Sequence, residues 1–308
     1  MAFTFVDLFS GIGGFHIACV KNGGTCIGAC EIDEKARQIY YDNFGIMPHD
    51  DIRKYAKHAK HADVLCAGFP CQSHSTLGKR KGLKDSRGKL FNVLCKYIRY
   101  TQPKTILLEN VKGLLSSDGG KTFKYILKCL QRIGYHLSWA LLDSKNFGLP
   151  QHRERVYIVG NLKQTVNLSK LIKYKSAKDN ALKHFLDKKK PDENLTCSIF
   201  KDNKFILKPK KTRIGFILRS KLSNYTNRKL FSSNGIIGTI NTGSPPPIYD
   251  ERYKVARHLS KSELKACQGF PKSFKFPLNT SRSEVVHYIG NSVSINVVSR
   301  IIKDAIAV

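Results

Sequence analysis

Short apolar runs alternate with longer amphipathic segments along the first half of the chain. The short runs have the length and composition of β-strands, and the amphipathic segments between them, for example 34–43 and 120–133, have the pattern of helices. Strands alternating with helices favour an α/β fold whose mainly parallel sheet carries helices on both faces. The predicted strands are Thr4–Phe9, Thr25–Cys30, Asp63–Ala67, Thr105–Glu109, Leu137–Leu142 and Val156–Val159.

The pattern changes near Asn161. Residues 161–230 contain 19 Lys and Arg against five Asp and Glu, with short and irregular apolar patches. We interpret this segment, together with the turn-rich 232–247, as a smaller and very basic region of mixed strand and loop. Regular patterning returns at Ser260–Cys267 and at Val293–Ala307, where we expect a final helix.

The charge of the whole chain points to a polyanionic partner. The sequence has 53 Lys and Arg against 23 Asp and Glu, a formal net charge of +30. Nucleic acid is the commonest polyanion that a protein of this charge meets. A lysine-rich composition that serves solubility alone is the other interpretation, and charge says nothing about the fold.

Several protein classes do not fit the sequence. No apolar run approaches the roughly 20 residues that span a bilayer, and the N-terminal segment lacks the features of a signal peptide. We therefore expect a cytoplasmic protein. The nine cysteines lack paired CxxC spacing, so we expect reduced thiols, mostly buried as small hydrophobic side chains, and no metal site.

A glycine-rich turn follows the first predicted strand. Ser10-Gly11-Ile12-Gly13-Gly14 would let the backbone turn tightly into a helix and approach a ligand closely. Residue 16 is His where the dinucleotide fingerprint has glycine, which disfavours a nicotinamide-dependent enzyme. Glu31 ends the second strand, where a carboxylate can hold ribose hydroxyls. The turn thus suits an adenosine-type ligand, although a simple structural turn is the alternative.

A thiol and a carboxylate follow two other predicted strands. Cys71 comes after 63–69 and Glu109 after 105–108, so a parallel sheet brings both to the edge that carries the glycine turn. A thiolate can add to C6 of cytosine while a carboxyl group supplies or shares a proton at N3. This addition makes C5 nucleophilic. Taken singly, Cys71 could be a buried small residue and Glu109 a helix cap.

Two arginines precede the last predicted strand of the first half. If the chain is extended there, Gln151, Arg153 and Arg155 share one face. Such a face can bind phosphate and the O2 edge of a base, and arginine lowers the pKa of a neighbouring thiol. A solvated, charged strand entry is the alternative interpretation.

These residues occur in one order together with further blocks. The blocks are 7–15 (DLFSGIGGF), 68–72 (GFPCQ), 81–91 (KGLKDSRGKLF), 109–111 (ENV), 151–155 (QHRER), 259–271 (LSKSELKACQGFP) and 290–293 (GNSV). That order resembles the DNA (cytosine-5)-methyltransferase family, especially its compact bacterial restriction–modification members. The resemblance covers nearly the whole chain except about 161–230.

The resemblance implies an architecture. It implies a Rossmann-like mixed sheet of S-adenosylmethionine-dependent methyltransferases, with helices on both faces, and a smaller basic target-recognition domain. The catalytic domain would comprise 1–164 and 282–308, and the recognition domain 165–281. The segment 290–293 would pack beside the first glycine turn.

The resemblance also implies a role for each matching residue. Cys71 would be the nucleophile, Glu109 would engage N3, and Arg153 and Arg155 would stabilise the site. The residues expected to bind S-adenosylmethionine are Phe9, Gly11, Ile12, Gly14, Glu31, Ile32, Asp51, Ile52, Pro70, Leu90, Asn291 and Val293. The residues expected to contact DNA are Gln72, Ser75, Leu77, Asn110, Val111, Gln151, Asn234 and Thr239.

Some positions depart from the family pattern. Ile32 stands where some relatives place an aromatic residue under the adenine. Thr239-Ile240 resembles a short Thr-Leu element of the recognition region, but Gly243 is followed by Ser-Pro-Pro-Pro in place of a glycine run. The location of the recognition element can therefore be predicted, whereas the DNA sequence that it reads cannot.

The resemblance implies double-stranded DNA as the substrate and allows a cognate restriction endonuclease as a partner. One chain with both domains is expected to work as a monomer. An RNA (tRNA) cytosine-5 methyltransferase and a catalytically silent nucleic-acid-binding protein on the same scaffold are the alternatives. The former is disfavoured by Gly68-Phe69-Pro70-Cys71 and by the large recognition region. The latter is disfavoured by the presence of both Cys71 and Glu109.

Overall fold

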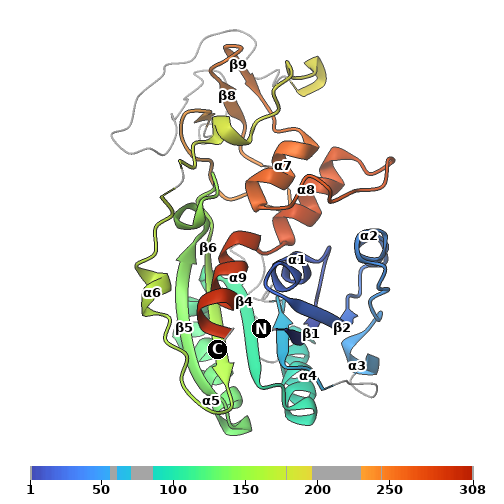
Figure 1. The fold of residues 1–308 in the computed structure, drawn as a ribbon, viewed down its shortest axis with the longest axis vertical. Helices are drawn as coiled ribbons and strands as arrows, with labels where there is room; N and C mark the ends of the chain where they lie inside the picture. Colours follow the sequence, from blue (N-terminus) through green and yellow to red (C-terminus); the bar gives the residue numbers. More distant parts are fainter. Residues whose placement is uncertain are drawn as a thin grey trace. The chain divides into compact units, whose positions relative to one another are not determined.

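The computed structural model (Figure 1) describes residues 2–55, 61–70, 86–177, 179–195, 230–243 and 245–306. The chain separates into two compact units. The first comprises Met1–Leu142, Glu154–Tyr174 and Val297–Val308, and the second comprises Asp143–Arg153 and Lys175–Asn296. These units do not coincide with the predicted catalytic and recognition domains, since 143–153 and 282–296 belong to the second unit and 165–174 to the first. The division of functions between domains stays a prediction.

A six-stranded mixed sheet organises the first unit. Its strand order is β2-β1-β3-β4-β6-β5. Strand β1 pairs in parallel with β2 and β3, β3 pairs in parallel with β4, and β6 runs antiparallel to β4. All six predicted strands are confirmed, as is the predicted α/β class with a mixed sheet, whereas the smaller recognition domain stays a prediction. The strands are β1 (Phe3–Leu8), β2 (Gly24–Cys30), β3 (Val64–Ala67), β4 (Thr105–Val111), β5 (His136–Asp143) and β6 (Glu154–Asn161).

Helices cover both faces of this sheet (Figure 1). They are α1 (Gly14–Lys21), α2 (Glu34–Phe44), α3 (Ile52–Tyr55), α4 (Ser86–Thr101), α5 (Lys121–Ile133), α6 (Ser169–Ile172) and α9 (Ile295–Ile301). The predicted helices at 34–43 and 120–133 are confirmed as α2 and α5. The predicted final helix is found as α9, which continues as a π-helix over Ile302–Ile306.

The core follows the two-residue period of the strands. Side chains at alternate positions, such as Leu8, Leu65 and Leu108, point to the face that α4 and α5 cover with Leu94 and Ile126. The opposite face carries α1. There the His16 ring contacts the Phe5 ring edge-on at 5.4 Å, and the Cys19 and Cys66 sulfurs are 3.7 Å apart. Both faces of the sheet are therefore shielded from solvent, which explains why the strand sequences are almost continuously apolar.

Short elements make up the second unit. They are two 3-10 turns at Leu182–Phe185 and Glu193–Leu195, the strands β7 (Phe231–Ser232), β8 (Ile248–Asp250) and β9 (Val255–Arg257), and the helices α7 (Lys261–Gln268) and α8 (Arg282–Asn291). A further 3-10 turn spans Ser144–Phe147. Each helix begins with a capping box, Ser260 with Glu263 in α7 and Ser281 with Glu284 in α8. The predicted helix at 260–267 is confirmed.

A buried arginine links three of these elements. The Arg257 guanidinium on β9 donates to the carboxylates of Asp250 on β8 and Glu263 on α7 at 2.7–3.1 Å. All three side chains are at most 1% exposed. Burial acts to raise the pKa of Asp250, but hydrogen bonds from Arg252 and Arg257 outweigh it and lower that pKa. This ion cluster holds together a unit that has little regular structure.

In the described residues, no helix combines the length and the hydropathy needed to cross a membrane.

The Asp63 carboxylate should make folding sensitive to acid. It pairs with Lys104 at 2.7 Å and accepts from the Thr4 backbone and hydroxyl at 2.8 and 2.9 Å. These contacts lower its pKa to about 2, against about 3.9 in an unfolded chain. The stabilisation is therefore full above pH of about 4 and is lost as the pH falls toward 2. In urea titrations across that range, Asp63→Asn should flatten the pH dependence of the unfolding free energy. Equal slopes for the two proteins would contradict the assignment.

Candidate functional site

The glycine turn leaves β1 through an unusual backbone. Phe9, Gly11 and Gly13 have φ of 54°, 52° and 88°, in the left-handed region that favours glycine. A Cβ at Gly13 would lie 2.2 Å from the Phe44 ring, whereas a Cβ at Gly11 would meet nothing within 4 Å. Gly13 is thus required by packing, and Gly11 leaves open space where a ligand can approach the backbone.

The Glu31 carboxylate braces this turn. Its oxygens accept from the backbone N–H of Gly11 at 2.8 Å and of Asp33 at 2.9 Å. Burial raises the pKa of Glu31, and these two hydrogen bonds act in the opposite direction. The next side chain, Ile32, is 71% exposed. The end of β2 therefore presents a carboxylate beside an exposed apolar side chain, the combination expected for a ribose and an adenine.

The other residues predicted to bind a cofactor in the first unit divide by exposure. Ile12, Gly14 and Ile52 are buried, so they lie in the packing beneath the surface of the unit. Phe9, Pro70 and Leu90 are half-buried. Asp51 lies at the start of α3, where hydrogen bonds and charge from Arg53 lower its pKa. The residues predicted to bind the cofactor in this unit therefore include both buried and accessible positions.

A buried acid lies under the glycine turn. Asp7 on β1 is fully buried. Burial raises its pKa well above the ordinary value, the backbone N–H of His16 opposes the shift, and the negative charge of Glu31 adds to it. No role was predicted for Asp7, because a single acidic residue in an apolar strand gives no indication of what faces it.

An ion pair lies at the carboxyl end of β4. The Glu109 carboxylate lies 3.1 Å from Nε of Arg155 on β6, and the two side chains are only 12% and 14% exposed. A Cβ at Gly68 would lie 3.8 Å from Glu109 Oε2. The carboxylate therefore lies beside the segment 68–70, which leads directly into Cys71.

Asn110 ties the same segment to β4. Its side chain is 3% exposed, and its Nδ2 donates to the Phe69 carbonyl at 3.0 Å. The Asn110 amide is thus used inside the protein, and its contact with DNA stays a prediction. Val111, the next residue, is 40% exposed and is accessible to a ligand.

Four predicted residues lie outside the described residues: Cys71, Gln72, Ser75 and Leu77. Their roles as nucleophile and as DNA contacts stay predictions.

Arg153 belongs to the second unit and is 2% exposed. Its guanidinium donates to the carbonyls of Ile240, Gly290 and Ser292 at 2.8–3.1 Å. These carbonyls come from two segments, so Arg153 organises the end of α8 and the 240 region. Arg153 thus binds backbone carbonyls, whereas Arg155 pairs with the Glu109 carboxylate.

Gln151 is fully buried in the same region. Its amide donates to Gln268 Oε1 at 2.6 Å and to the Cys267 carbonyl at 3.2 Å, and its oxygen accepts from Ile240 N at 3.0 Å. Burial and these bonds occupy the Gln151 side chain inside the protein, and its contact with DNA stays a prediction. Gln268, which also donates to the Ser292 carbonyl, was not predicted, since 117 residues separate it from Gln151.

The remaining predicted residues lie in the second unit. The Asn291 side chain is exposed and contacts His287 at 3.2 Å, whereas Val293 is 5% exposed. Asn234 is exposed in the turn after β7. Thr239 is half-buried and its hydroxyl donates to the His152 carbonyl at 2.8 Å. Of these, Asn234 and Asn291 are the most accessible to ligands.

Comparison with known proteins agrees with this arrangement. The sequence profile described as C-5 cytosine-specific DNA methylase matches residues 3–307. The chain belongs to this family. The type II methyltransferase M.MspI of Moraxella sp is 34% identical over 97% of the chain and 69% of its own length. The type II methyltransferase M.HhaI of Haemophilus parahaemolyticus is 31% identical over 96% of the chain and 92% of its own length.

Solved structures share the fold at lower identity. The S. pombe Dnmt2 methyltransferase superposes with a TM-score of 0.76 at 18% identity and covers 97% of each chain. A putative DNA modification methyltransferase encoded within an E. coli prophage superposes with a TM-score of 0.71 at 20% identity and covers 98% of each chain. The predicted family and enzyme class, a DNA (cytosine-5)-methyltransferase, are confirmed by the family membership.

The two arginines should respond differently to the same substitution. Arg153→Lys places all donors on one nitrogen, which cannot occupy the positions of both terminal guanidinium nitrogens, so it should lower the unfolding free energy by about 2–4 kcal/mol. Arg155→Lys should leave the urea midpoint nearly unchanged and lower the rate of methyl transfer, because the bond to Glu109 is lost or weakened. Urea titration and a methyl-transfer assay on both variants check this. An inactive Arg153→Lys variant of unchanged stability would place Arg153 in the chemistry.

Proposed function

We propose that this protein transfers a methyl group from S-adenosylmethionine to C5 of a flipped-out cytosine in a specific short sequence of double-stranded DNA. The proposed reaction passes through a covalent bond between Cys71 and C6. The observation that carries the proposal is the place of Glu109, paired with Arg155 at 3.1 Å and adjacent to Gly68, three residues before Cys71.

The chemistry follows from the electronic structure of cytosine. C5 is a poor nucleophile until the Cys71 thiolate adds to C6 and the Glu109 carboxyl group shares a proton with N3. The adduct is an enamine whose C5 accepts the methyl group. Loss of the C5 proton then breaks the bond to C6 and releases the thiol. Arg155 orients the Glu109 carboxylate and contributes positive charge at the strand end.

The glycine turn and the end of β2 fit the methyl donor. Gly11 offers open space beside its backbone, Glu31 offers a carboxylate for ribose hydroxyls, and Ile32 is an exposed apolar surface for adenine. When bound, S-adenosylmethionine supplies an electrophilic methyl group. Asn291 and Val293 are proposed to complete this site from the C-terminal segment.

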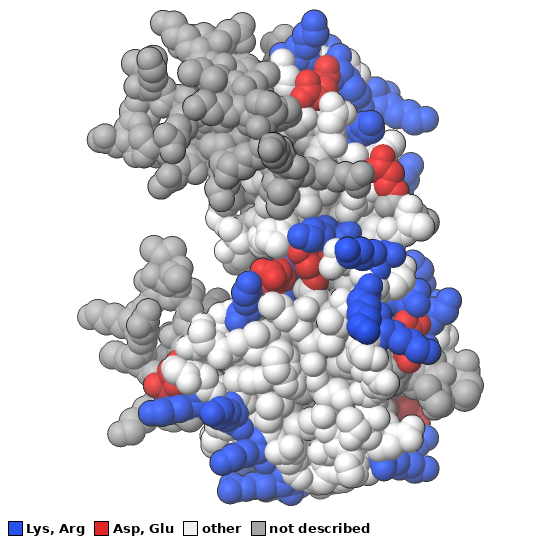
Figure 2. Space-filling model, turned by 90° about the vertical axis from the view of Figure 1, so that its left-hand side faces the viewer, with Lys and Arg blue, Asp and Glu red and all other residues white. Residues whose placement is uncertain are grey.

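The basic character of the chain supports a duplex substrate. A cytosine in a duplex must leave the stack at a cost of a few kcal/mol, and phosphate contacts can offset this cost. On the face drawn in Figure 2, Lys and Arg atoms cover more surface than Asp and Glu atoms. We propose that 165–281 recognises the target, with Asn234 and Thr239 near the bases. A monomer that acts in the cytoplasm beside a cognate restriction endonuclease completes the proposal.

Bisulfite sequencing tests this function. Unmethylated plasmid DNA incubated with the protein and S-adenosylmethionine should contain protected cytosines in one short sequence context.

Cys71→Ser should abolish protection and leave DNA affinity unchanged within about twofold, because the hydroxyl is a far weaker nucleophile. A duplex with 5-fluorocytosine at the target should form an adduct that survives denaturation with the wild-type protein only. Methylation by the Cys71→Ser variant would contradict the covalent mechanism. Methylation of tRNA but not of DNA would identify RNA as the substrate.

The role of Glu31 can be tested separately from catalysis. Glu31→Gln removes the negative charge beside the glycine turn, so the Kd for S-adenosylmethionine should rise at least about tenfold. Glu34→Gln is a matched control, because Glu34 is exposed in the first turn of α2 nearby. Calorimetric titration measures both. Equal affinities for the two variants would remove Glu31 from the cofactor site.

A further inference from the structure

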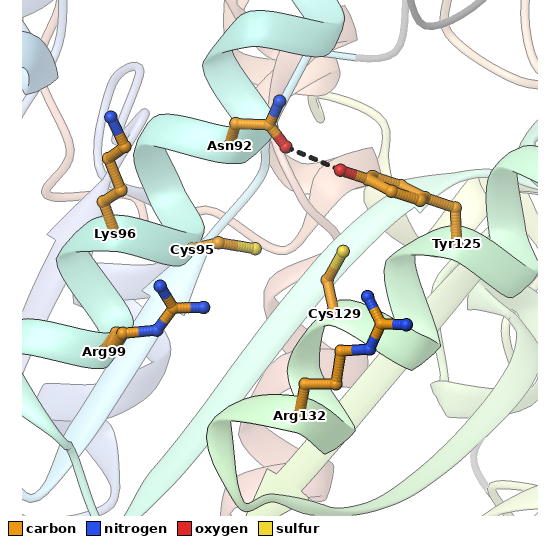
Figure 3. Close-up of a pocket in the computed structure, with 7 residues that line it drawn as sticks. All are labelled: Asn92, Cys95, Lys96, Arg99, Tyr125, Cys129 and Arg132. Atoms are coloured by element: carbon orange, nitrogen blue, oxygen red, sulfur yellow. Dashed lines mark hydrogen bonds between the residues drawn. The ribbon is translucent and has the colours of Figure 1, made fainter.

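A pocket of about 270 Å³ lies between α4 and α5 on the outer side of the first unit (Figure 3). Its lining includes three cationic side chains, Lys96 and Arg99 from α4 and Arg132 from α5. Asn92 and Tyr125 also line it, and the Tyr125 hydroxyl donates to Asn92 Oδ1 at 3.0 Å. That bond leaves the Asn92 amide group as a further donor at the rim of the pocket.

No acidic side chain that the structure describes neutralises the positive charge of this lining. Among the residues that the structure describes, no carboxylate pairs with Lys96, Arg99 or Arg132, and the lining contains no acidic residue. Neither α4 nor α5 contains Asp or Glu. The three cationic side chains are exposed, so solvent screens their mutual repulsion and leaves their charges accessible to an anion.

Helix geometry alone does not explain this arrangement. Arg99 and Arg132 lie in the last turns of their helices, where a cation stabilises the helix dipole by about 0.3–1 kcal/mol. That effect does not require the two arginines to face one pocket, and it does not involve Lys96, which lies a turn earlier. The pocket lining therefore presents three accessible cations to an anionic ligand.

The pocket is separate from the candidate active site. Helix α4 ends at Thr101, just before β4 begins at Thr105, and α5 ends at Ile133, just before β5 begins at His136. Arg99 and Arg132 therefore lie toward the edge where these strands start. Glu109 lies at the other end of β4, so this pocket does not contribute to the methylation chemistry.

We propose that this pocket binds the phosphate groups of an anionic ligand. Two guanidinium groups offer planar pairs of N–H donors that match phosphate oxygens, and the Lys96 ammonium adds a mobile charge. A carboxylate offers fewer oxygens than three cations and an amide can satisfy. The volume is slightly below the roughly 300–1,000 Å³ of sites for drug-sized ligands, so the occupant is a compact phosphate or diphosphate group. The group belongs either to a small molecule or to a nucleic-acid backbone.

Two thiols in the lining offer a direct readout of occupancy. Cys95 is 7% exposed, and Cys129 is half-buried on α5. In Figure 3 both sulfurs point toward the space between the helices. A ligand held by Arg132 would shield Cys129 from small alkylating reagents.

Pyrophosphate is the probe for the experiment. Calorimetric titration of the full chain should detect binding, and Arg99→Gln with Arg132→Gln should weaken it at least about tenfold. The matched control is Lys124→Gln with Lys128→Gln, which removes two charges from exposed positions of α5 outside the pocket. The control should keep its affinity within about twofold. Pyrophosphate should also slow the reaction of Cys129 with iodoacetamide, measured by peptide mass spectrometry, in the control and not in the pocket variant.

A second arm identifies the source of the phosphate. Affinity for a non-specific DNA duplex, measured at several salt concentrations, should be equal in the two variants if the ligand is a small molecule. A larger loss in the pocket variant assigns the phosphate to nucleic acid. The proposal is overturned if both double variants lose pyrophosphate binding equally, because general charge attraction would then explain it. It is also overturned if the wild-type protein binds no pyrophosphate and the variants bind duplex equally.

Discussion

The antiparallel register of β4 and β6 is the constraint on which the candidate site depends. Val111 lies opposite Arg155, and Glu109 lies opposite Tyr157. Residues two apart on a strand share a face, so Glu109 and Arg155 are diagonal neighbours on the same side of the sheet. Their ion pair at 3.1 Å follows from this register. A slip of one residue would turn one of the two side chains to the opposite face.

The carboxyl end of β4 also controls the segment before Cys71. The parallel pairing of β3 with β4 places Ala67 beside Leu108. The next residues of the two strands continue side by side, where Asn110 holds the Phe69 carbonyl and Glu109 lies beside Gly68. Hydrogen bonding of a buried amide is strongly favoured over leaving it unpaired. The backbone segment that leads to Cys71 is therefore held by the Asn110 amide.

Arginine serves four different purposes in this chain. Arg257 neutralises two buried carboxylates, and Arg153 binds three backbone carbonyls. Arg155 pairs with one carboxylate at a strand end, and Arg99 and Arg132 have no acidic partner in the described structure. The rigid guanidinium fork makes the first two roles possible in an interior. Only a cation that the fold leaves unneutralised is available for a phosphate ligand.

The sequence by itself determined the six strands, the α/β class and the family, because alternation of apolar runs and ordered motif blocks are local properties. It also placed Glu31 and Glu109 at strand ends, since the carboxyl ends of parallel strands share one edge. It did not distinguish Arg153 from Arg155 or assign Gln151 and Asn110 to the interior. Those outcomes depend on partners such as Gln268, Gly290 and Phe69, which are distant in sequence. Only the tertiary structure decides whether a polar side chain meets a carbonyl, a carboxylate or solvent, because that choice is made by packing between segments.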